Sequence, residues 1–331
     1  MSGGSGSGGV LRAAAGRLLG AVPVLFGVVA VNFALMQLAP GDLAEVLAGE
    51  QGAATPEMMA ELRARFGLDQ PVWLQFARYM GNLLQGDLGY SHRLGLPVLT
   101  LIAERLPATL LLMVPAILLA SGAGMLLGMT AARRRGTWVD AAISVGVLLA
   151  YATPLFWVGL MLIVLFSVHL AWLPVGGMRD PSASLSGMAL VLDTGRHMVL
   201  PVLTLTLFYA ALYARLMRAS MLAVLDQDYV RTARAKGLSR WQVEAVHAGR
   251  NALLPVLTMI GLQAGSLLGG AVLVETVFSW PGLGRLAFDA ITRRDLNLLL
   301  GIVLVSSVTV VAVNFVVDLL YGVADPRVRA S

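Results

Sequence analysis

The chain has 331 residues, of which 57% are apolar and 13% charged, against roughly a quarter charged residues in soluble domains. This composition indicates an integral membrane protein. The net charge of +5 is spread between apolar runs, which excludes a nucleic-acid-binding protein. Cysteine is absent, so disulfides and Cys-ligated metal centres are excluded.

Residues 1–17 read as a flexible, Gly/Ser-rich N-terminus, and an apolar run follows from Leu18 to Ala39. The apolar core of a signal peptide has about 7 to 15 residues and ends in small residues at a cleavage site. This run is about 22 residues long, the length of a membrane-spanning helix. We therefore expect a first membrane helix here.

Six apolar runs of about 20 residues predict six transmembrane helices in an all-α integral membrane protein. The runs cover residues 18–39, 106–132, 140–168, 198–222, 253–274 and 296–320. They form one transmembrane domain, 18–320, followed by a tail, 321–331. Pro115 and Pro154 lie inside spans and should kink them.

The distribution of arginine predicts the orientation. Six spans place both termini on one side, and the short loop after the second span carries Arg133, Arg134 and Arg135. Because basic residues concentrate in cytoplasmic loops, we expect cytoplasmic N and C termini. The outer segment 42–105 then lies outside, and the segment 223–252 lies in the cytoplasm.

The cytoplasmic segment carries the strongest local signal, YVRTARAKGL at 229–238 with RNALLP from residue 250. It predicts a short basic helix, a turn at Gly237, and a second amphipathic helix from Ser239 to Gly249. Glycine suits a helix C-terminus because it adopts left-handed conformations, and serine is a good N-cap. Physical chemistry alone leaves open a loop that only sets topology and contacts anionic lipid headgroups.

The segment resembles the coupling loop, or EAA loop, of ABC-importer permeases in the dipeptide, oligopeptide and nickel family. Ala233 and Gly237 match the general pattern, whereas Arg231, Thr232 and Arg250 depart from it. In that family the loop sits in a groove on an ATP-hydrolysing subunit. The resemblance assigns coupling to Arg231, Thr232, Ala233, Ala235, Lys236, Gly237 and Leu238.

Other motifs are similar to the same family and occur in its order. They are FGLDQP at 66–71, GDLGYS at 86–91, ERLPAT at 104–109, ETVFSWPGLG at 275–284 and ADPRVR at 324–329. The resemblance implies a type I (MetI-like) permease fold, in the first permease of a pair. It also implies a multi-pass protein of the bacterial inner membrane that takes up small peptides, with nickel and glutathione as alternatives.

The resemblance further implies partners. These are a second homologous permease, two P-loop ATPase subunits and an extracytoplasmic substrate-binding protein, which would dock near the outer loops that hold Trp172 and Trp280. Tryptophan at such positions is also an interfacial anchor. The lipid bilayer is a further expected partner, and no nucleic acid is expected.

No catalytic site, metal site or cofactor site is expected in this chain. It has no G-x-x-x-x-G-K-[ST] pattern, and its one lysine, Lys236, is followed by glycine, so ATP and Mg²⁺ would be bound by partner subunits. The four histidines have no metal-like spacing, and neither G-x-S-x-G nor H-E-x-x-H occurs.

Polar residues in spans should face protein or a water-filled path. We expect Gln263 and Asn314 to line a translocation path, and Asp318 to reach interfacial water or to pair with an arginine. Glycines at 124 and 128, and at 261, 265 and 269, predict helix-packing seams. A proton-coupled secondary transporter is the alternative function, although the spans show no clear mid-membrane acid.

Overall fold

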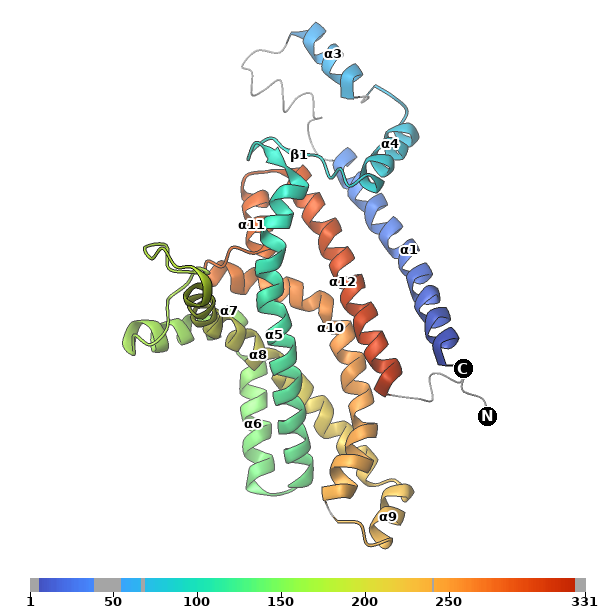
Figure 1. The fold of residues 1–331 in the computed structure, drawn as a ribbon, viewed down its shortest axis with the longest axis vertical. Helices are drawn as coiled ribbons and strands as arrows, with labels where there is room; N and C mark the ends of the chain where they lie inside the picture. Colours follow the sequence, from blue (N-terminus) through green and yellow to red (C-terminus); the bar gives the residue numbers. More distant parts are fainter. Residues whose placement is uncertain (1–5, 39–54, 67–68, 240, 325–331) are drawn as a thin grey trace. The chain divides into compact units, whose positions relative to one another are not determined.

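The computed structural model describes residues 6–38, 55–66, 69–239 and 241–324 (Figure 1). These residues are almost entirely helical, with one two-stranded antiparallel hairpin, which confirms the all-α class. They form two compact units. The first holds the start of the chain up to Ala15, Glu104–Asp289 and the end of the chain from Thr309, and the second holds Gly16–Ala103 and Ala290–Val308.

The elements follow one another along the chain, and several helices exceed the length of their predicted spans. They are α1 (Gly6–Leu38), α3 (Pro56–Phe66), α4 (Val72–Leu84), β1 (Tyr90–Ser91), β2 (Leu96–Pro97), α5 (Val98–Arg133), α6 (Trp138–Ala152), α7 (Leu155–Leu162), the π-helix η1 (Ile163–His169), α8 (Gly187–Leu225), α9 (Asp228–Ala235), the π-helix η2 (Gln242–Ala248), α10 (Gly249–Val277), α11 (Leu283–Thr292) and α12 (Leu296–Ala324).

Candidate membrane spans account for most of the predicted apolar runs. Among the described residues, four helices are long and apolar enough to cross a membrane, and the bent pair α6 and α7–η1 makes a fifth if it counts as one span. Helix α10 covers the run 253–274 as one helix but is not among these candidates. The chain is therefore a multi-pass membrane protein, and the number six stays a prediction.

The third predicted span is broken rather than kinked. Helix α6 ends at Ala152, α7 begins at Leu155, and the chain bends by 102° between them. Pro154 stands at this break, because proline lacks the N–H of the helix ladder and its ring clashes with the preceding turn. By contrast, α5 continues through Pro115.

Helices α5 and α8 pack backbone to backbone at two glycines. A Cβ on Gly124 would lie 2.6 Å from the Cβ of Tyr213, and one on Gly128 would lie 2.7 Å from the Cβ of Met217. Neither position has room for a side chain, so the two helices approach more closely than larger residues allow. The predicted seam at 124 and 128 is confirmed.

The predicted seam of α10 is looser where it is described. A Cβ on Gly265 would meet the two methyl groups of Val310 in α12 at 3.7 and 3.9 Å, which are ordinary contacts. The side-chain surroundings of residue 269 lie outside the described part.

A buried carboxylate organises the turn between α10 and α11. Glu275 has no exposed surface, and it accepts hydrogen bonds from the Thr109 hydroxyl at 2.6 Å and from the backbone N–H of Arg285 at 3.0 Å. The Thr109 hydroxyl oxygen in turn accepts from the N–H of Leu283 at 2.7 Å. The first N–H groups of α11, which have no partner within their own helix, are thereby satisfied.

Trp280 is not an interfacial anchor, and this expectation from the sequence is wrong. Its side chain is fully buried in the core of the first unit, and its indole N–H donates to the backbone oxygen of Ala108 at 2.8 Å. A buried indole needs such a partner. Trp172, at 62% exposure, remains available at the surface.

In the second unit, polar and aromatic contacts join α1 to α4 and to the first part of α12. Asn32 of α1 donates to the backbone oxygen of Leu300 at 3.1 Å, so this polar group in a membrane helix faces protein, as expected. The rings of Phe33 and Phe76 lie 5.2 Å apart, which holds α4 against α1.

Candidate functional site

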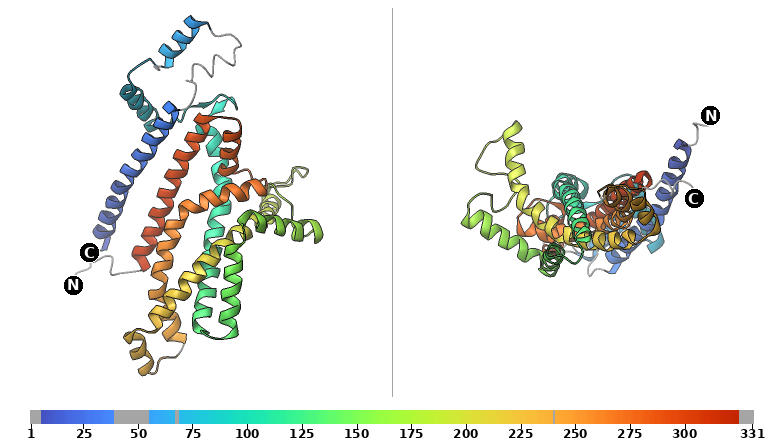
Figure 2. Two further views of the ribbon diagram at one scale, coloured as in Figure 1. Left: turned by 180° about the vertical axis from the view of Figure 1, so that it is seen from behind. Right: turned by 90° about the horizontal axis from the view of Figure 1, so that it is seen from below.

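The candidate site is the segment between α8 and α10. It contains α9 and η2. Helices α5 and α6 run side by side in both Figure 1 and Figure 2, and the segment lies at the same end of the first unit as the turn that joins these two helices. The two predicted helices are confirmed. The second differs from the prediction, because it is a π-helix that runs into α10 without a break.

Gly237 ends α9 as the sequence predicted. Its φ is +78°, its N–H donates to the oxygen of Arg234 at 3.0 Å, and the N–H of Leu238 donates to the oxygen of Ala233 at 3.4 Å. These two bonds form the Schellman arrangement, which satisfies the last carbonyl groups of a helix. The residue at the left-handed position determines how the loop turns.

The loop has a small apolar core of its own. Val230 and Ala233 of α9 pack with Val243 of η2, and Val224 and Leu225 at the end of α8 lie against them. Ala233 is thus a buried packing residue that holds α9 to η2, although the sequence reasoning grouped it with the other coupling residues.

The remaining predicted coupling residues lie together on the exposed surface of the loop. They are Arg231, Thr232, Ala235, Lys236, Gly237 and Leu238. With Arg234, which is also exposed, they form a basic face. Arg231 lies 3.6 Å from the Asp228 carboxylate, but both are solvent-exposed, and such pairs contribute little. The face therefore keeps its positive charge.

Two exposed aromatic residues flank this basic face and were missed by the sequence reasoning. Tyr229 is 42% exposed and Trp241 is 61% exposed. The Tyr229 hydroxyl oxygen accepts a hydrogen bond from Asn251 at 2.6 Å, which fixes the ring beside the start of α10. Large aromatic rings beside arginines were the available signal, since both types are enriched at protein interfaces.

The second half of the loop begins with a capping box. The N–H of Ser239 donates to the side-chain oxygen of Gln242 at 3.0 Å, and the N–H of Gln242 donates to the Ser239 hydroxyl at 3.3 Å. This reciprocal pair satisfies two backbone donors at a helix start. The expected N-cap at Ser239 is confirmed, and the S-x-x-Q spacing was its signal.

A partly buried ion pair joins the loop to the end of α5. Arg133 Nε donates to the Glu244 carboxylate at 2.6 Å, with the Glu244 side chain 5% exposed. The sequence reasoning assigned Arg133 only to membrane orientation. No local pattern signals this contact, because the two residues are 111 positions apart.

The two predicted path residues lie on different helices of the first unit. Gln263 is half-buried on α10, and Asn314 is half-buried on α12. The side-chain oxygen of Asn314 is buried without a hydrogen-bond partner among the described residues. The side chain of Asp318 lies outside the described part.

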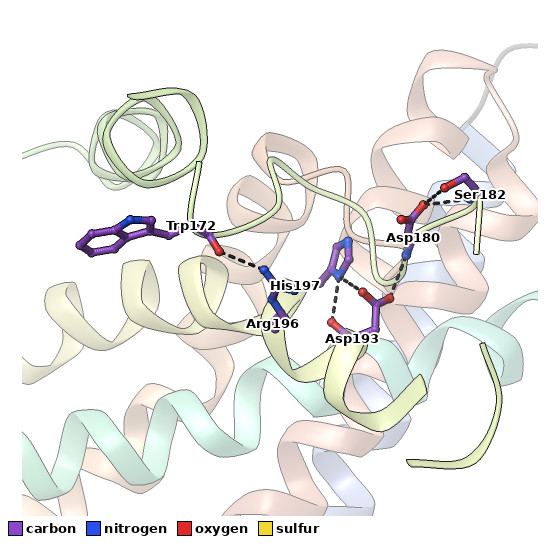
Figure 3. A network of polar contacts seen from close by, with 6 residues as sticks. All are labelled: Trp172, Asp180, Ser182, Asp193, Arg196 and His197. Atoms are coloured by element: carbon purple, nitrogen blue, oxygen red, sulfur yellow. Dashed lines mark hydrogen bonds and ion pairs between the residues drawn. The ribbon is translucent and has the colours of Figure 1, made fainter. Parts of the chain in front are cut away.

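A second polar cluster fixes the loop before α8 (Figure 3). Arg196 donates to the backbone oxygen of Trp172 at 3.1 Å, and the carboxylate of Asp193 accepts from the N–H of Asp180 at 2.9 Å. Hydrogen bonds from the Ser182 hydroxyl and N–H hold the pKa of Asp180 below its usual value. The Nδ1 atom of His197 lies 2.9 Å from the backbone oxygen of Asp193. The cluster holds the backbone at the exposed Trp172.

The described residues include no group of three or more His, Asp or Glu side chains placed to hold a metal ion. The site therefore consists of a basic and aromatic surface, its internal packing and its link to α5. Such a surface can bind another protein.

Two family models match the chain and together cover almost all of it. The model of the binding-protein-dependent transport system inner membrane component matches residues 124–330, and a model of the N-terminal part of such membrane components matches residues 10–113. The chain belongs to the family of binding-protein-dependent transport system inner membrane components.

Individual relatives match over nearly their whole length. The di/tripeptide transport system permease protein DppB of Pseudomonas aeruginosa is 47% identical, with 93% of this chain and 96% of that protein covered. The dipeptide transport system permease protein DppB of Escherichia coli K12 is 44% identical, with 95% and 97% covered.

Among solved structures, a chain of the inward-facing MetNI methionine ABC transporter matches with a TM-score of 0.55 and 15% identity, covering 68% of this chain and 96% of that one. This likeness shows the fold, and it confirms the expected MetI-like permease fold.

Proposed function

We propose that this chain is a permease subunit of an ATP-binding-cassette importer for small peptides. The observation that carries the proposal is the identity of 44% and 47% to two peptide permeases along almost the entire chain. The multi-pass helical fold and the exposed loop agree with a transport subunit. We infer six transmembrane helices, cytoplasmic termini and a location in the bacterial inner membrane.

In this proposal the loop between α8 and α10 couples the permease to an ATPase subunit. Arg231, Lys236 and Leu238 form part of an exposed basic and apolar surface, which complements an acidic groove with apolar walls. Two P-loop ATPase subunits would bind ATP and Mg²⁺, because this sequence has no phosphate-binding loop of its own. A second permease and a substrate-binding protein would complete the assembly.

The translocation path is proposed to include Gln263 and Asn314. The side-chain oxygen of Asn314, which has no hydrogen-bond partner among the described residues, supports this assignment, since a buried polar atom in a membrane helix requires a partner such as water or a passing substrate. A peptide backbone offers N–H donors that suit an amide oxygen.

The test has two parts. The tagged protein, purified from its own membrane in mild detergent, should bring a second permease, P-loop ATPases and a binding protein, identified by mass spectrometry. The complex, reconstituted in vesicles, should take up a radiolabelled dipeptide only when ATP is supplied on the cytoplasmic side.

Other outcomes lead to the alternatives. ATP-driven uptake of radiolabelled glutathione or of a labelled nickel chelate, without uptake of the radiolabelled dipeptide, would reassign the substrate within the family. A chain purified without ATPases, with uptake driven by a proton gradient, would contradict the proposal and support a secondary transporter.

A further inference from the structure

The cytoplasmic end of α5 lies close to two points of the chain, one in the loop and one at the start of α10. At the first, the last residue of α5, Arg133, donates to Glu244 in η2 at 2.6 Å. The Glu244 side chain is 5% exposed and that of Arg133 is 36% exposed. Because partly buried charges are screened less than surface charges, this pair holds more firmly than the exposed pair within α9.

At the second point, a Cβ on Gly249 would lie 3.5 Å from the terminal methyl of Met129. Met129 precedes Arg133 by four residues, which is one turn of an α-helix. Gly249 follows Glu244 by five residues, which is one turn of a π-helix. Glu244 in η2 and Gly249 at the start of α10 are therefore one π-helical turn apart and both face the end of α5. Two such points restrain the orientation of the loop relative to α5 as well as its distance from α5.

The chain itself connects the loop to α8 and α10, since it leaves α8 at Leu225 and enters α10 at Gly249. Helix α5 is distant from the loop in the sequence, because Arg133 and Glu244 are 111 residues apart. Side chains must therefore hold α5 to the loop. Earlier in α5, Gly124 and Gly128 pack backbone to backbone on α8. A force that the loop exerts on Arg133 therefore acts on both helices of a close-packed pair.

We propose that Arg133 and Glu244 form a joint through which movement of the loop is transmitted to α5, so that both are positioning residues for transport. The inference rests on the proposed function, because it takes the loop to be the surface on which the ATPase acts. The proposal gives Arg133 a role that its neighbours Arg134 and Arg135 do not share. Those two residues are exposed and fit only the role of setting the orientation of the chain in the membrane.

The contact is tested first without any transport. Thermal unfolding of the chain in lipid nanodiscs is compared for Arg133→Gln, Glu244→Gln and the double variant, with Arg134→Gln as the matched control. Arg133→Gln should lower Tm more than Glu244→Gln, because it removes the guanidinium that donates to a buried carboxylate while the carboxylate stays charged. The double variant should lose less than the two single losses combined, whereas simple addition of the two losses would contradict the pair.

The joint is tested next in the reconstituted complex. Glu244→Gln should leave ATP hydrolysis in place while peptide uptake per ATP hydrolysed falls at least about fivefold, the lower end of typical coupling between sites. Arg134→Gln should match the unaltered complex. The exchanged pair Arg133→Glu with Glu244→Arg should regain most of the lost uptake, because it restores the attraction with reversed polarity.

Normal uptake by Arg133→Gln and Glu244→Gln would overturn the proposal, and so would a loss that the folded exchanged pair fails to regain. If the exchanged pair does not reach the membrane, Arg133→Lys decides: uptake above that of Arg133→Gln supports the joint, and equal uptake overturns it. Absence of ATP-driven uptake in the unaltered complex would instead contradict the proposed function, while the unfolding experiment still decides whether the contact exists.

Discussion

Arg218 and Asp140 form a two-pronged ion pair that ties α8 to α6. The guanidinium donates from Nε to Oδ1 at 2.7 Å and from Nη2 to Oδ2 at 2.8 Å. The same carboxylate accepts the backbone N–H of Gly136 at 3.1 Å, in the turn between α5 and α6. One side chain therefore fixes both a turn and a contact between helices.

The geometry predicts that Arg218→Lys is not a conservative change. Lysine keeps the charge but cannot make two parallel hydrogen bonds to one carboxylate, so the free energy of unfolding should fall by about 1–3 kcal/mol. The measurement is Tm in nanodiscs. Arg135→Lys, in an exposed position, is the control, and equal Tm values for the two variants would contradict the importance of the second hydrogen bond.

The seam between α5 and α8 predicts that Gly128→Ala is harmful. The added methyl would overlap the backbone of α8 near Met217, and overpacking of this kind costs about 1–3 kcal/mol. Gly122→Ala on the same helix has nothing within 4 Å of its Cβ and should be neutral or slightly stabilising. Membrane levels and Tm should separate the two variants, and a Gly128→Ala protein as stable as Gly122→Ala would show that the helices lie further apart.

Local features of the fold were predictable from the sequence because local chemistry determines them. Apolar runs long enough for a bilayer became helices, a glycine supplied the left-handed turn at residue 237, and serine with glutamine three residues later made the cap at Ser239. Pro154 indicated an interruption, but the bend of 102° depends on what α6 and α7 pack against, which no local pattern contains.

Long-range contacts were not predictable in the same way. Ala233 was grouped with the coupling residues, and the sequence did not show that it is buried because η2 folds back and places Val243 against it. Trp280 was expected at the membrane interface, yet its partner, the backbone oxygen of Ala108, is 172 positions away. The π-helical winding of η2 likewise has no composition signal, so the link from Glu244 to Arg133 becomes visible only in three dimensions.

The buried carboxylate at the start of α11 predicts a strong effect of Glu275→Gln. An amide replaces one carboxylate oxygen with an NH₂ group, so either the Thr109 hydroxyl or the Arg285 N–H loses its acceptor. A buried donor without an acceptor costs about 1–3 kcal/mol, so both Tm and the yield of detergent-solubilised protein should fall. Thr109→Val, which removes the hydroxyl shared with Leu283, should destabilise in the same direction. A Glu275→Gln protein with unchanged Tm would show that the carboxylate does not cap α11.

Substitutions at Gly237 test whether the turn after α9 carries coupling rather than stability alone. Gly237→Ala places a side chain at a φ of +78°, which costs about 1–2 kcal/mol, with open space around the new Cβ. Gly237→Pro fixes φ near −65° and removes the N–H that donates to Arg234, so the loop cannot close in its native form. In the reconstituted complex the proline variant should remain in the membrane and lose ATP-driven peptide uptake, with the alanine variant in between.

Gly146→Ala is the control for this series, because Gly146 lies inside α6 with nothing within 4 Å of its Cβ. Rates of ATP hydrolysis, measured with uptake on the same vesicles, separate two causes of failure. Hydrolysis that continues without uptake means that the loop still binds the ATPase but no longer transmits its movement, whereas loss of both means that binding itself requires the turn. Normal uptake by the proline variant would contradict the assignment of coupling to Gly237, because transport would then not require the native turn of the loop.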